Sequence, residues 1–211
     1  MTILSSDGAA RDWVRERFGV SRETMLADFA EMVRAEASNQ NLVSAATLDQ
    51  LWLRHIADSA QLLTMLPKPP TADDLWIDIG TGAGFPGVVA AILVPCRVRL
   101  VEPRKRRAAF LAESVAALGL HDRVEVAATK IEQQTGKARI ISARAVAVLP
   151  ALLQSAAHLA RRDTIWLLPK GVNALEEVAV ARKTWHGSFH VEQSLTQPGS
   201  LILIATGVAR R

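Results

Sequence analysis

The chain of 211 residues has the length of one α/β domain with an extension, and its 49% hydrophobic residues allow a sizeable core. A single cysteine, Cys96, excludes an internal disulfide and fits a reducing, cytoplasmic compartment. The longest apolar run, about residues 85–96, is shorter than the ~20 residues of a membrane helix, and the first residues lack the apolar segment of a secretory signal, so we expect neither feature. The net charge of +4 permits a polyanionic partner without requiring one.

Residues 1–70 have the periodicity of helices. The pattern predicts a short amphipathic helix over residues 11–18, a second helix with Ser21 as its N-cap, and a third helix over about residues 47–66. The proline-rich stretch that follows ends the third helix and is the best candidate for a linker. We therefore expect an N-terminal helical extension over residues 1–70 and a second domain over residues 71–211.

From residue 71 onward, strands and helices alternate. Strands are predicted over residues 75–79, 97–101, 123–127, 139–143, 163–168, 188–195 and 201–206, and helices over residues 86–94, 104–118, 150–160 and 173–183. Such a repeat indicates an α/β fold with a mostly parallel seven-stranded sheet covered by helices on both faces. A tight connection joins the last two strands, so they are expected to pair as an antiparallel terminal hairpin.

Four glycines, Gly80, Gly82, Gly84 and Gly87, fall between the first of these strands and the helix after it. A backbone so rich in glycine bends sharply and lets a ligand come close. The spacing fits two cofactors, because Gly80-x-Gly82-x-Gly84 is typical of an S-adenosylmethionine loop and Gly82-x-Gly84-x-x-Gly87 of a dinucleotide loop. Glu102 ends the next strand, 22 positions after Gly80, a spacing that suits a carboxylate bound to the ribose hydroxyls of either cofactor.

Residues beside the loop favour S-adenosylmethionine. Pro86 removes a backbone donor where a pyrophosphate would bind, and Phe85 is bulky beside it, but a ligand without phosphates tolerates both. Asp78 is expected to support the loop or to meet the cofactor's ammonium group, and the terminal hairpin is typical of the methyltransferase sheet. A turn that binds nothing, a nucleotide-binding module without catalysis and an NAD-binding oxidoreductase remain alternatives.

Several short motifs are more specific than the glycine loop. They are Asn41-Leu-Val-Ser44, Arg54-His-Ile-Ala-Asp-Ser59, Glu102 with Arg106-Arg107, Ser142-Ala-Arg-Ala-Val146 and Lys170-Gly171. Together with the loop they resemble the RsmG (GidB) family, from about Phe29 to the C-terminus. The resemblance implies a Rossmann-like class I methyltransferase fold, S-adenosyl-L-methionine as cofactor, and methylation of guanine N7 in the 16S rRNA of the small ribosomal subunit.

The resemblance also assigns roles to single residues. It places Ile131 and Glu132 at the adenine of the cofactor, and Arg144 at the end of the site shared by cofactor and substrate. The expected cofactor contacts are therefore Gly80, Gly82, Phe85, Glu102, Ile131, Glu132 and Arg144. The basic pair Arg106-Arg107 stands where Lys-Arg is common in the family.

The implied chemistry needs little from the protein. Guanine N7 carries a free lone pair and attacks the sulfonium methyl in line, so we expect no general base and no other catalytic residue. The histidines lack the spacing of metal ligands, so we expect no metal. Proximity and alignment would then account for catalysis. A methyltransferase of small molecules or proteins remains an alternative, as does a purely structural ion pair at Arg144.

Basic residues near the expected site are candidates for RNA contacts. Positive charge at a helix start opposes the helix dipole, so the run ending in Arg106 and Arg107 indicates a nearby polyanion, with a solvated face as the alternative. Arg54, His55 and Lys170 complete the predicted set, although His55 could also brace the helices and Lys170 could mark a turn. We expect a monomer that binds 16S rRNA or the small ribosomal subunit.

Overall fold

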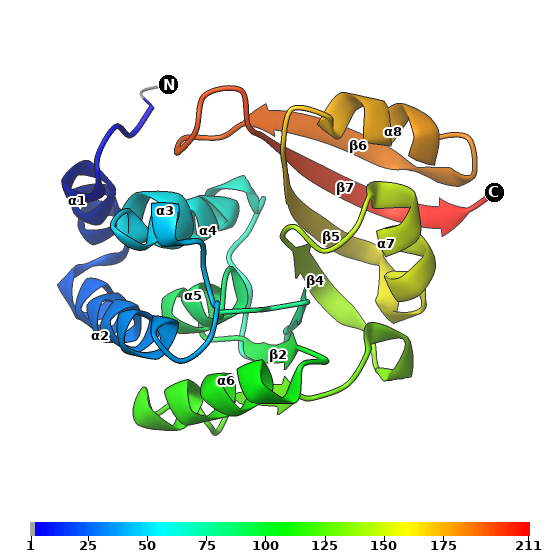
Figure 1. The fold of residues 1–211 in the computed structure, drawn as a ribbon. Helices are drawn as coiled ribbons and strands as arrows, with labels where there is room; N and C mark the ends of the chain where they lie inside the picture. The colour runs from blue at the N-terminus through cyan, green and yellow to red at the C-terminus, as the bar shows by residue number, and fades with distance from the viewer. Residues whose placement is uncertain (1–2) are drawn as a thin grey trace.

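A computed structural model describes residues 3–211 and contains one seven-stranded sheet with helices on both faces (Figure 1). The strands are β1 (Leu75–Ile79), β2 (Arg97–Val101), β3 (Val124–Ala127), β4 (Ala138–Ala143), β5 (Ala160–Lys170), β6 (Trp185–Gln193) and β7 (Leu201–Arg210). They lie in the order β3-β2-β1-β4-β5-β7-β6. The first five strands are parallel and β7 is antiparallel to both β5 and β6, so the predicted sheet with its terminal hairpin is confirmed.

Helices that follow successive strands divide between the two faces of the sheet. α5 (Gly87–Leu93) and α6 (Lys105–Ala117) pack on one face, and α7 (Leu149–Ala156) and α8 (Ala174–Ala181) pack on the other. The chain thus changes face between β1 and β4, which is where ligands bind in sheets of this kind. Among residues 3–211, none of the helices combines the length and apolarity that spanning a bilayer requires.

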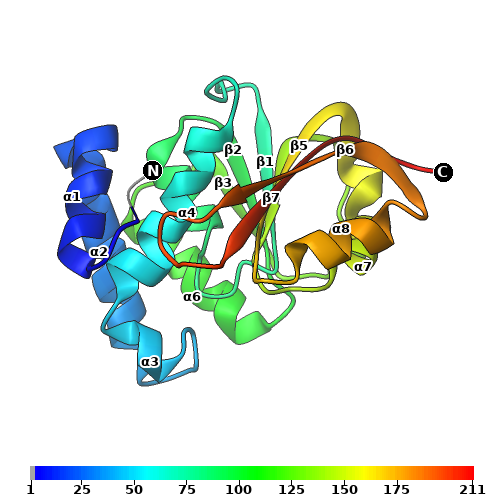
Figure 2. The same cartoon turned by 90° about the horizontal axis from the view of Figure 1, so that it is seen from above.

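The N-terminal extension lies on the side of the molecule away from α7 and α8 (Figure 2). It begins with α1 (Asp7–Phe18), whose N-cap Ser6 accepts a hydrogen bond from the Ala9 N–H, and continues with α2 (Val20–Ala37). The prediction of Ser21 as an N-cap is wrong, because Ser21 lies inside α2. The chain turns instead at Gly19, whose φ of 89° is in the region that glycine readily adopts.

The helix predicted over residues 47–66 is broken into shorter pieces. These are α3 (Ala45–Leu48), a π-helical segment (Trp52–Ala57), α4 (Asp58–Ala60) and a 3₁₀ segment (Gln61–Met65). The Asp7 carboxylate accepts hydrogen bonds from the backbone N–H groups of Trp52 at 3.2 Å and Leu53 at 2.8 Å. A side chain from α1 therefore caps a helical start near Leu51, a few residues into the predicted helix.

The extension and the sheet share one hydrophobic core. Phe29 of α2 is fully buried, and its ring centre lies 5.4 Å from that of Phe85 in the loop before α5. The same buried cluster continues through Val88 to Leu100 of β2. The division into an extension over residues 1–70 and a domain over residues 71–211 therefore stays a prediction, since one buried cluster spans both parts.

Candidate active site

The glycine loop crosses the carboxyl edge of the sheet between β1 and α5. Gly80 and Gly82 have φ angles of 63° and 61°, in the left-handed region that disfavours other residues. The Gly80 N–H donates to the Val101 carbonyl at 2.8 Å, which ties the loop to the end of β2. A Cβ atom at Gly82 would meet nothing closer than 3.8 Å, so the backbone there is open to a ligand.

Asp78 lies fully buried beneath this loop. One of its carboxylate oxygens accepts from the Gly87 N–H at 3.0 Å, and the other accepts from the Ser142 hydroxyl at 2.6 Å. Burial raises the pKa of Asp78 to about 6. Of the two roles that the sequence allows, Asp78 therefore performs the supporting one, at the start of α5.

Three further cofactor candidates lie along the same edge. Glu102 is 3% exposed, and its two oxygens accept from the N–H groups of Gly82 and Arg104, both at 2.9 Å. Ile131 is buried and Glu132 is exposed in the turn after β3. Because β1, β2 and β3 are neighbours in the sheet, the loop, Glu102 and this turn form a row along its carboxyl edge.

Arg144 follows β4 and reaches across to the N-terminal extension. Its Nη1 donates to the Arg54 carbonyl at 3.1 Å and to the Asp58 carboxylate at 3.2 Å, and its Nη2 donates to His55 Nδ1 at 2.8 Å. The guanidinium carbon also lies 5.5 Å from the centre of the Phe85 ring. The ion pair considered as the structural alternative therefore exists, and it fixes Arg144 in place.

Phe85 itself is 3% exposed. Its ring packs against Phe29, against His55 at 5.0 Å between ring centres, and against Arg144. Phe85 thus holds the glycine loop to the extension by packing, and its predicted contact with the cofactor stays a prediction.

His55 is a neutral member of this cluster. A guanidinium only donates, so Nδ1 of His55 accepts from Arg144, and its Nε2–H donates to the Thr47 hydroxyl at 2.9 Å. Burial, followed by the charges of Arg144 and Arg54, lowers the pKa of His55 from 6.5 to about 3. His55 therefore brings no positive charge to an RNA contact.

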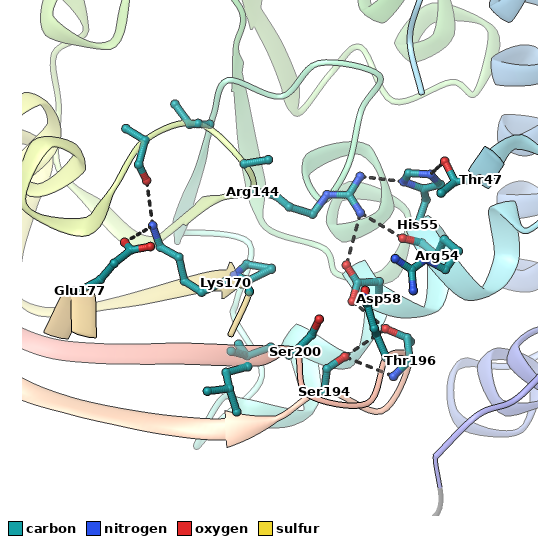
Figure 3. A pocket seen from close by; sticks show the side chains of 18 of the residues that line it. Thr47, Arg54, His55, Asp58, Arg144, Lys170, Glu177, Ser194, Thr196 and Ser200 are labelled. Atoms are coloured by element: carbon teal, nitrogen blue, oxygen red, sulfur yellow. Dashed lines mark hydrogen bonds and ion pairs between the residues drawn. The ribbon is translucent and has the colours of Figure 1, made fainter. Parts of the chain in front are cut away.

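A cavity of about 700 Å³ lies beside Arg144 at the carboxyl ends of β4 and β5 (Figure 3). The loop Ala145–Val148 forms one wall, and the segment carrying Arg54 and the connection between β6 and β7 form others. Val146 lines this cavity, and its methyl carbon lies 2.6 Å from the place where Gly80 would carry a Cβ atom. The cavity and the glycine loop therefore adjoin at Arg144 and Val146.

Thr47, Ser194 and Thr196 belong to this cavity, and sequence reasoning missed them. The Thr196 hydroxyl donates to the Asp58 carboxylate at 2.7 Å, and the Gln61 amide donates to Asp58 at 2.9 Å and to Ser194 at 3.2 Å. Nothing in the turn between β6 and β7 signals this role in the sequence. The turn gains it by folding back onto a segment 133 positions earlier.

The structure separates the predicted RNA contacts. Arg54 lines the cavity, and Arg106 is exposed at the start of α6. Arg107 is half-buried, and its Nη2 donates to the Asn41 carbonyl at 2.8 Å, so it ties the extension to α6. The side chain of Lys170 is only 9% exposed and pairs with Glu177 at 2.8 Å, which leaves little of its charge free for phosphate.

The sheet order, the glycine loop after β1 and the acid after β2 are those of the Rossmann-like methyltransferase fold. The chain is similar in fold to an O-methyltransferase from Bacillus cereus, with a TM-score of 0.61 at 14% identity, over 94% of this chain and 97% of that one. It is also similar in fold to a ribosomal protein L11 methylase from Lactobacillus delbrueckii subsp. bulgaricus, with a TM-score of 0.55 at 17% identity, over 75% and 79%.

Sequence comparison narrows this class to one family. A family model described as rRNA small subunit methyltransferase G matches residues 22–200. A relative of that name from Sphingopyxis alaskensis is 45% identical over 208 residues, covering 97% of this chain and 88% of the relative. Another from Rhizorhabdus wittichii is 42% identical over 206 residues, covering 96% and 93%. The chain therefore belongs to the rRNA small subunit methyltransferase G (GidB) family, and the resemblance seen in its sequence is confirmed.

Proposed function

We propose that this chain transfers a methyl group from S-adenosyl-L-methionine to N7 of a guanine in the 16S rRNA of the small ribosomal subunit, in the cytoplasm. Membership of the family is the observation that carries the proposal. The family description names small subunit rRNA and does not name the atom, so the choice of N7 rests on the resemblance and on the chemistry of the site.

The row of residues at the sheet edge fits S-adenosylmethionine. The open backbone at Gly82 allows close approach, and each Glu102 oxygen accepts one hydrogen bond from the chain and keeps a second lone pair for a ribose hydroxyl. Ile131 offers an apolar surface and Glu132 an exposed polar group further along the row, as an adenine requires. We propose that these four residues and Gly80 hold the cofactor.

The site suits a reaction that needs alignment and no proton transfer. When bound, the cofactor supplies an electrophilic methyl group, and a guanine in the 700 Å³ cavity has the free N7 lone pair to accept it. Three of the five N–H donors of Arg144 are used within the protein, which leaves two to orient guanine O6 or a phosphate. Correct placement of the two reactants is then the main source of the rate.

The Arg144 cluster itself suits a guanine that becomes cationic on methylation, while Arg54 adds a positive charge to the same cavity wall. The Asp58 carboxylate pairs with Arg144 at 3.2 Å, and His55 is neutral because its pKa is lowered to about 3. The cluster of Arg144, Asp58 and His55 therefore has no net charge. A protonated histidine in this position would repel the product.

An NAD-binding oxidoreductase fits the structure less well. A pyrophosphate in such enzymes binds the free N–H groups at the start of the helix after the glycine loop. In this chain Pro86 lacks an N–H, and the Gly87 N–H donates to the buried Asp78 carboxylate at 3.0 Å. The start of α5 is therefore already capped by an acid.

The acceptor is tested with S-adenosylmethionine that carries a labelled methyl group. The purified chain is incubated with small ribosomal subunits, with protein-free 16S rRNA and with a mixture of small amines and proteins, and NADH binding is titrated separately. We expect label only in rRNA, whether free or in the subunit. Label confined to the amines or proteins, or tight NADH binding without S-adenosylmethionine binding, would contradict the proposal.

A further inference from the structure

Lys170 and Glu177 close a small network at the far wall of the cavity from Arg144 (Figure 3). Lys170 Nζ donates to the Ala147 carbonyl and to Glu177 Oε2, both at 2.8 Å. The same Glu177 oxygen accepts from the Leu149 N–H at 2.6 Å, at the start of α7. The side chains of Lys170 and Glu177 are 9% and 18% exposed, so this ion pair is largely shielded from solvent.

The network holds one end of the loop Ala145–Val148, and Arg144 holds the other. Ala145 has a φ of 55°, a conformation that costs a residue other than glycine about 1 kcal/mol or more and persists only where neighbours impose it. Val146, the next residue, rests on Gly80 of the cofactor loop. The conformation of the loop Ala145–Val148 therefore determines how the glycine loop adjoins the cavity.

We infer that Lys170 and Glu177 are positioning residues for methyl transfer, which hold the loop Ala145–Val148 so that Arg144 and Val146 stand correctly between cofactor and acceptor. This inference rests on the proposed function, and it replaces the RNA-phosphate contact expected of Lys170. Misplacement of reacting groups by about 1 Å can lower a rate ~100-fold, so a loop held at both ends has kinetic value. The pair acts through the loop and needs no contact with either reactant.

The two possible roles of Lys170 predict different effects of Glu177→Gln, one on the KM for RNA and the other on turnover. If Lys170 bound phosphate, removing the Glu177 charge would free its ammonium group and lower the KM for RNA. If the pair holds the loop, Glu177→Gln weakens the bonds to Lys170 and to Leu149, and turnover falls. Glu176→Gln is the matched control, because Glu176 is the exposed neighbour in α8 and carries the same charge.

The experiment measures kcat, the KM for small ribosomal subunits and its salt dependence for Lys170→Met, Lys170→Arg, Glu177→Gln and Glu176→Gln. We expect kcat to fall roughly 10-fold or more in Lys170→Met and Glu177→Gln, while the KM for small ribosomal subunits stays within about twofold of the wild-type value. Lys170→Arg keeps a charged donor and should retain most of the turnover. A lower KM in Glu177→Gln together with a smaller salt slope in Lys170→Met would overturn the inference, as would unchanged kcat in both.

Hydrogen–deuterium exchange of a peptide covering residues 144–153 gives a second readout that needs no activity. The Leu149 amide donates to Glu177, so exchange there should accelerate in Glu177→Gln and Lys170→Met and stay unchanged in Glu176→Gln. Equal exchange in all variants would reject the positioning role. If the unchanged chain methylates no rRNA, the proposed function fails, and exchange alone still decides whether the pair holds the loop.

Discussion

Arg144, Asp58 and His55 form a cluster in which every side chain depends on the others. Arg144 donates to both partners, and Asp58 also accepts from Thr196 and Gln61. The cost of burying each polar group is offset by bonds that the others supply. In mild acid the protonation of His55 differs between the folded and the unfolded chain, because its folded pKa is lowered to about 3 while an unfolded histidine keeps a pKa near 6.5.

We predict that this neutral histidine makes the chain lose stability in mild acid. Above pH 6.5 His55 is neutral in both the folded and the unfolded chain. Below 6.5 only the unfolded form takes up the proton, down to the folded pKa of about 3. The loss attributable to His55 between pH 7 and pH 5 is about 2 kcal/mol.

Urea unfolding at several pH values checks this for the unchanged chain and for His55→Gln. The free energy of unfolding should fall more steeply with acid in the unchanged chain. Two parallel curves would show that His55 is not held neutral by the fold.

Residues were predictable where a local pattern determines their place. The glycines and Glu102 were predicted as site residues because they come directly after predicted strands, and the structure brings them together at one edge of the sheet. Lys170 follows a strand end equally well, but its partner Glu177 is an ordinary helical acid with no distinguishing pattern. The burial of Lys170 therefore could not be read from the sequence.

The N-terminal extension is part of the site at the scale of elements. Its π-helical segment carries His55 against Phe85 of the loop before α5, and α2 packs Phe29 against the same ring. The extension thus supports the glycine loop through Phe29, and it also forms part of the cavity wall through Arg54 and Asp58. Contacts of this kind join segments that the sequence presents as separate domains.

We predict that Phe29→Ala destabilises the whole chain by about 3–5 kcal/mol, because Phe29 is fully buried and the cavity left behind would lie beside the glycine loop. Unfolding followed by circular dichroism and by tryptophan fluorescence should stay a single transition at a lower midpoint. Phe18→Ala is the control, since Phe18 is only half-buried, and it should cost less. A transition confined to the extension would show that residues 1–70 fold independently.

Element boundaries were predictable where the core dictates them. β1 and β2 begin and end at the predicted residues, because β1 is a buried apolar run before Gly80 and β2 alternates arginines with buried aliphatic residues. β5 and β7 are longer than predicted, at Ala160–Lys170 and Leu201–Arg210. The added start of β5 pairs Ala160 with Ala138 of β4 and carries the exposed Arg161 and Arg162, and the added end of β7 pairs with the start of β6. These added residues lack an apolar run, so the pattern gave no strand signal there.

At the scale of the whole molecule, RNA binding depends less on the net charge of +4 than on which basic side chains are not already bonded within the protein. Several basic side chains near the site are engaged within the protein, Arg107 with Asn41, Arg144 with Asp58 and Lys170 with Glu177. Arg106 is exposed at the start of α6, on the same carboxyl edge as the glycine loop. Composition alone could not distinguish these cases.

We therefore predict that Arg106→Ala weakens rRNA binding and lowers the slope of log affinity against log salt by roughly 0.7–0.9, the effect of one lost phosphate contact. Arg162→Ala is the matched control, because Arg162 is exposed near the start of β5, at the opposite edge of the sheet. Filter binding over a salt series measures both variants. Equal salt slopes for Arg106→Ala and Arg162→Ala would show that Arg106 is a solvated surface residue that does not contact RNA.

The fold class could be predicted as a whole because alternating strands and helices leave few topologies, and the terminal hairpin selects among them. The acceptor atom is different, since no pattern in the fold names it. The most direct test is the nucleoside content of 16S rRNA from cells with and without this chain, measured by digestion and mass spectrometry. We predict that one 7-methylguanosine is lost without the chain and restored by the purified chain with S-adenosylmethionine. An unchanged 7-methylguanosine content, or loss of a methyl group from another atom, would contradict the account.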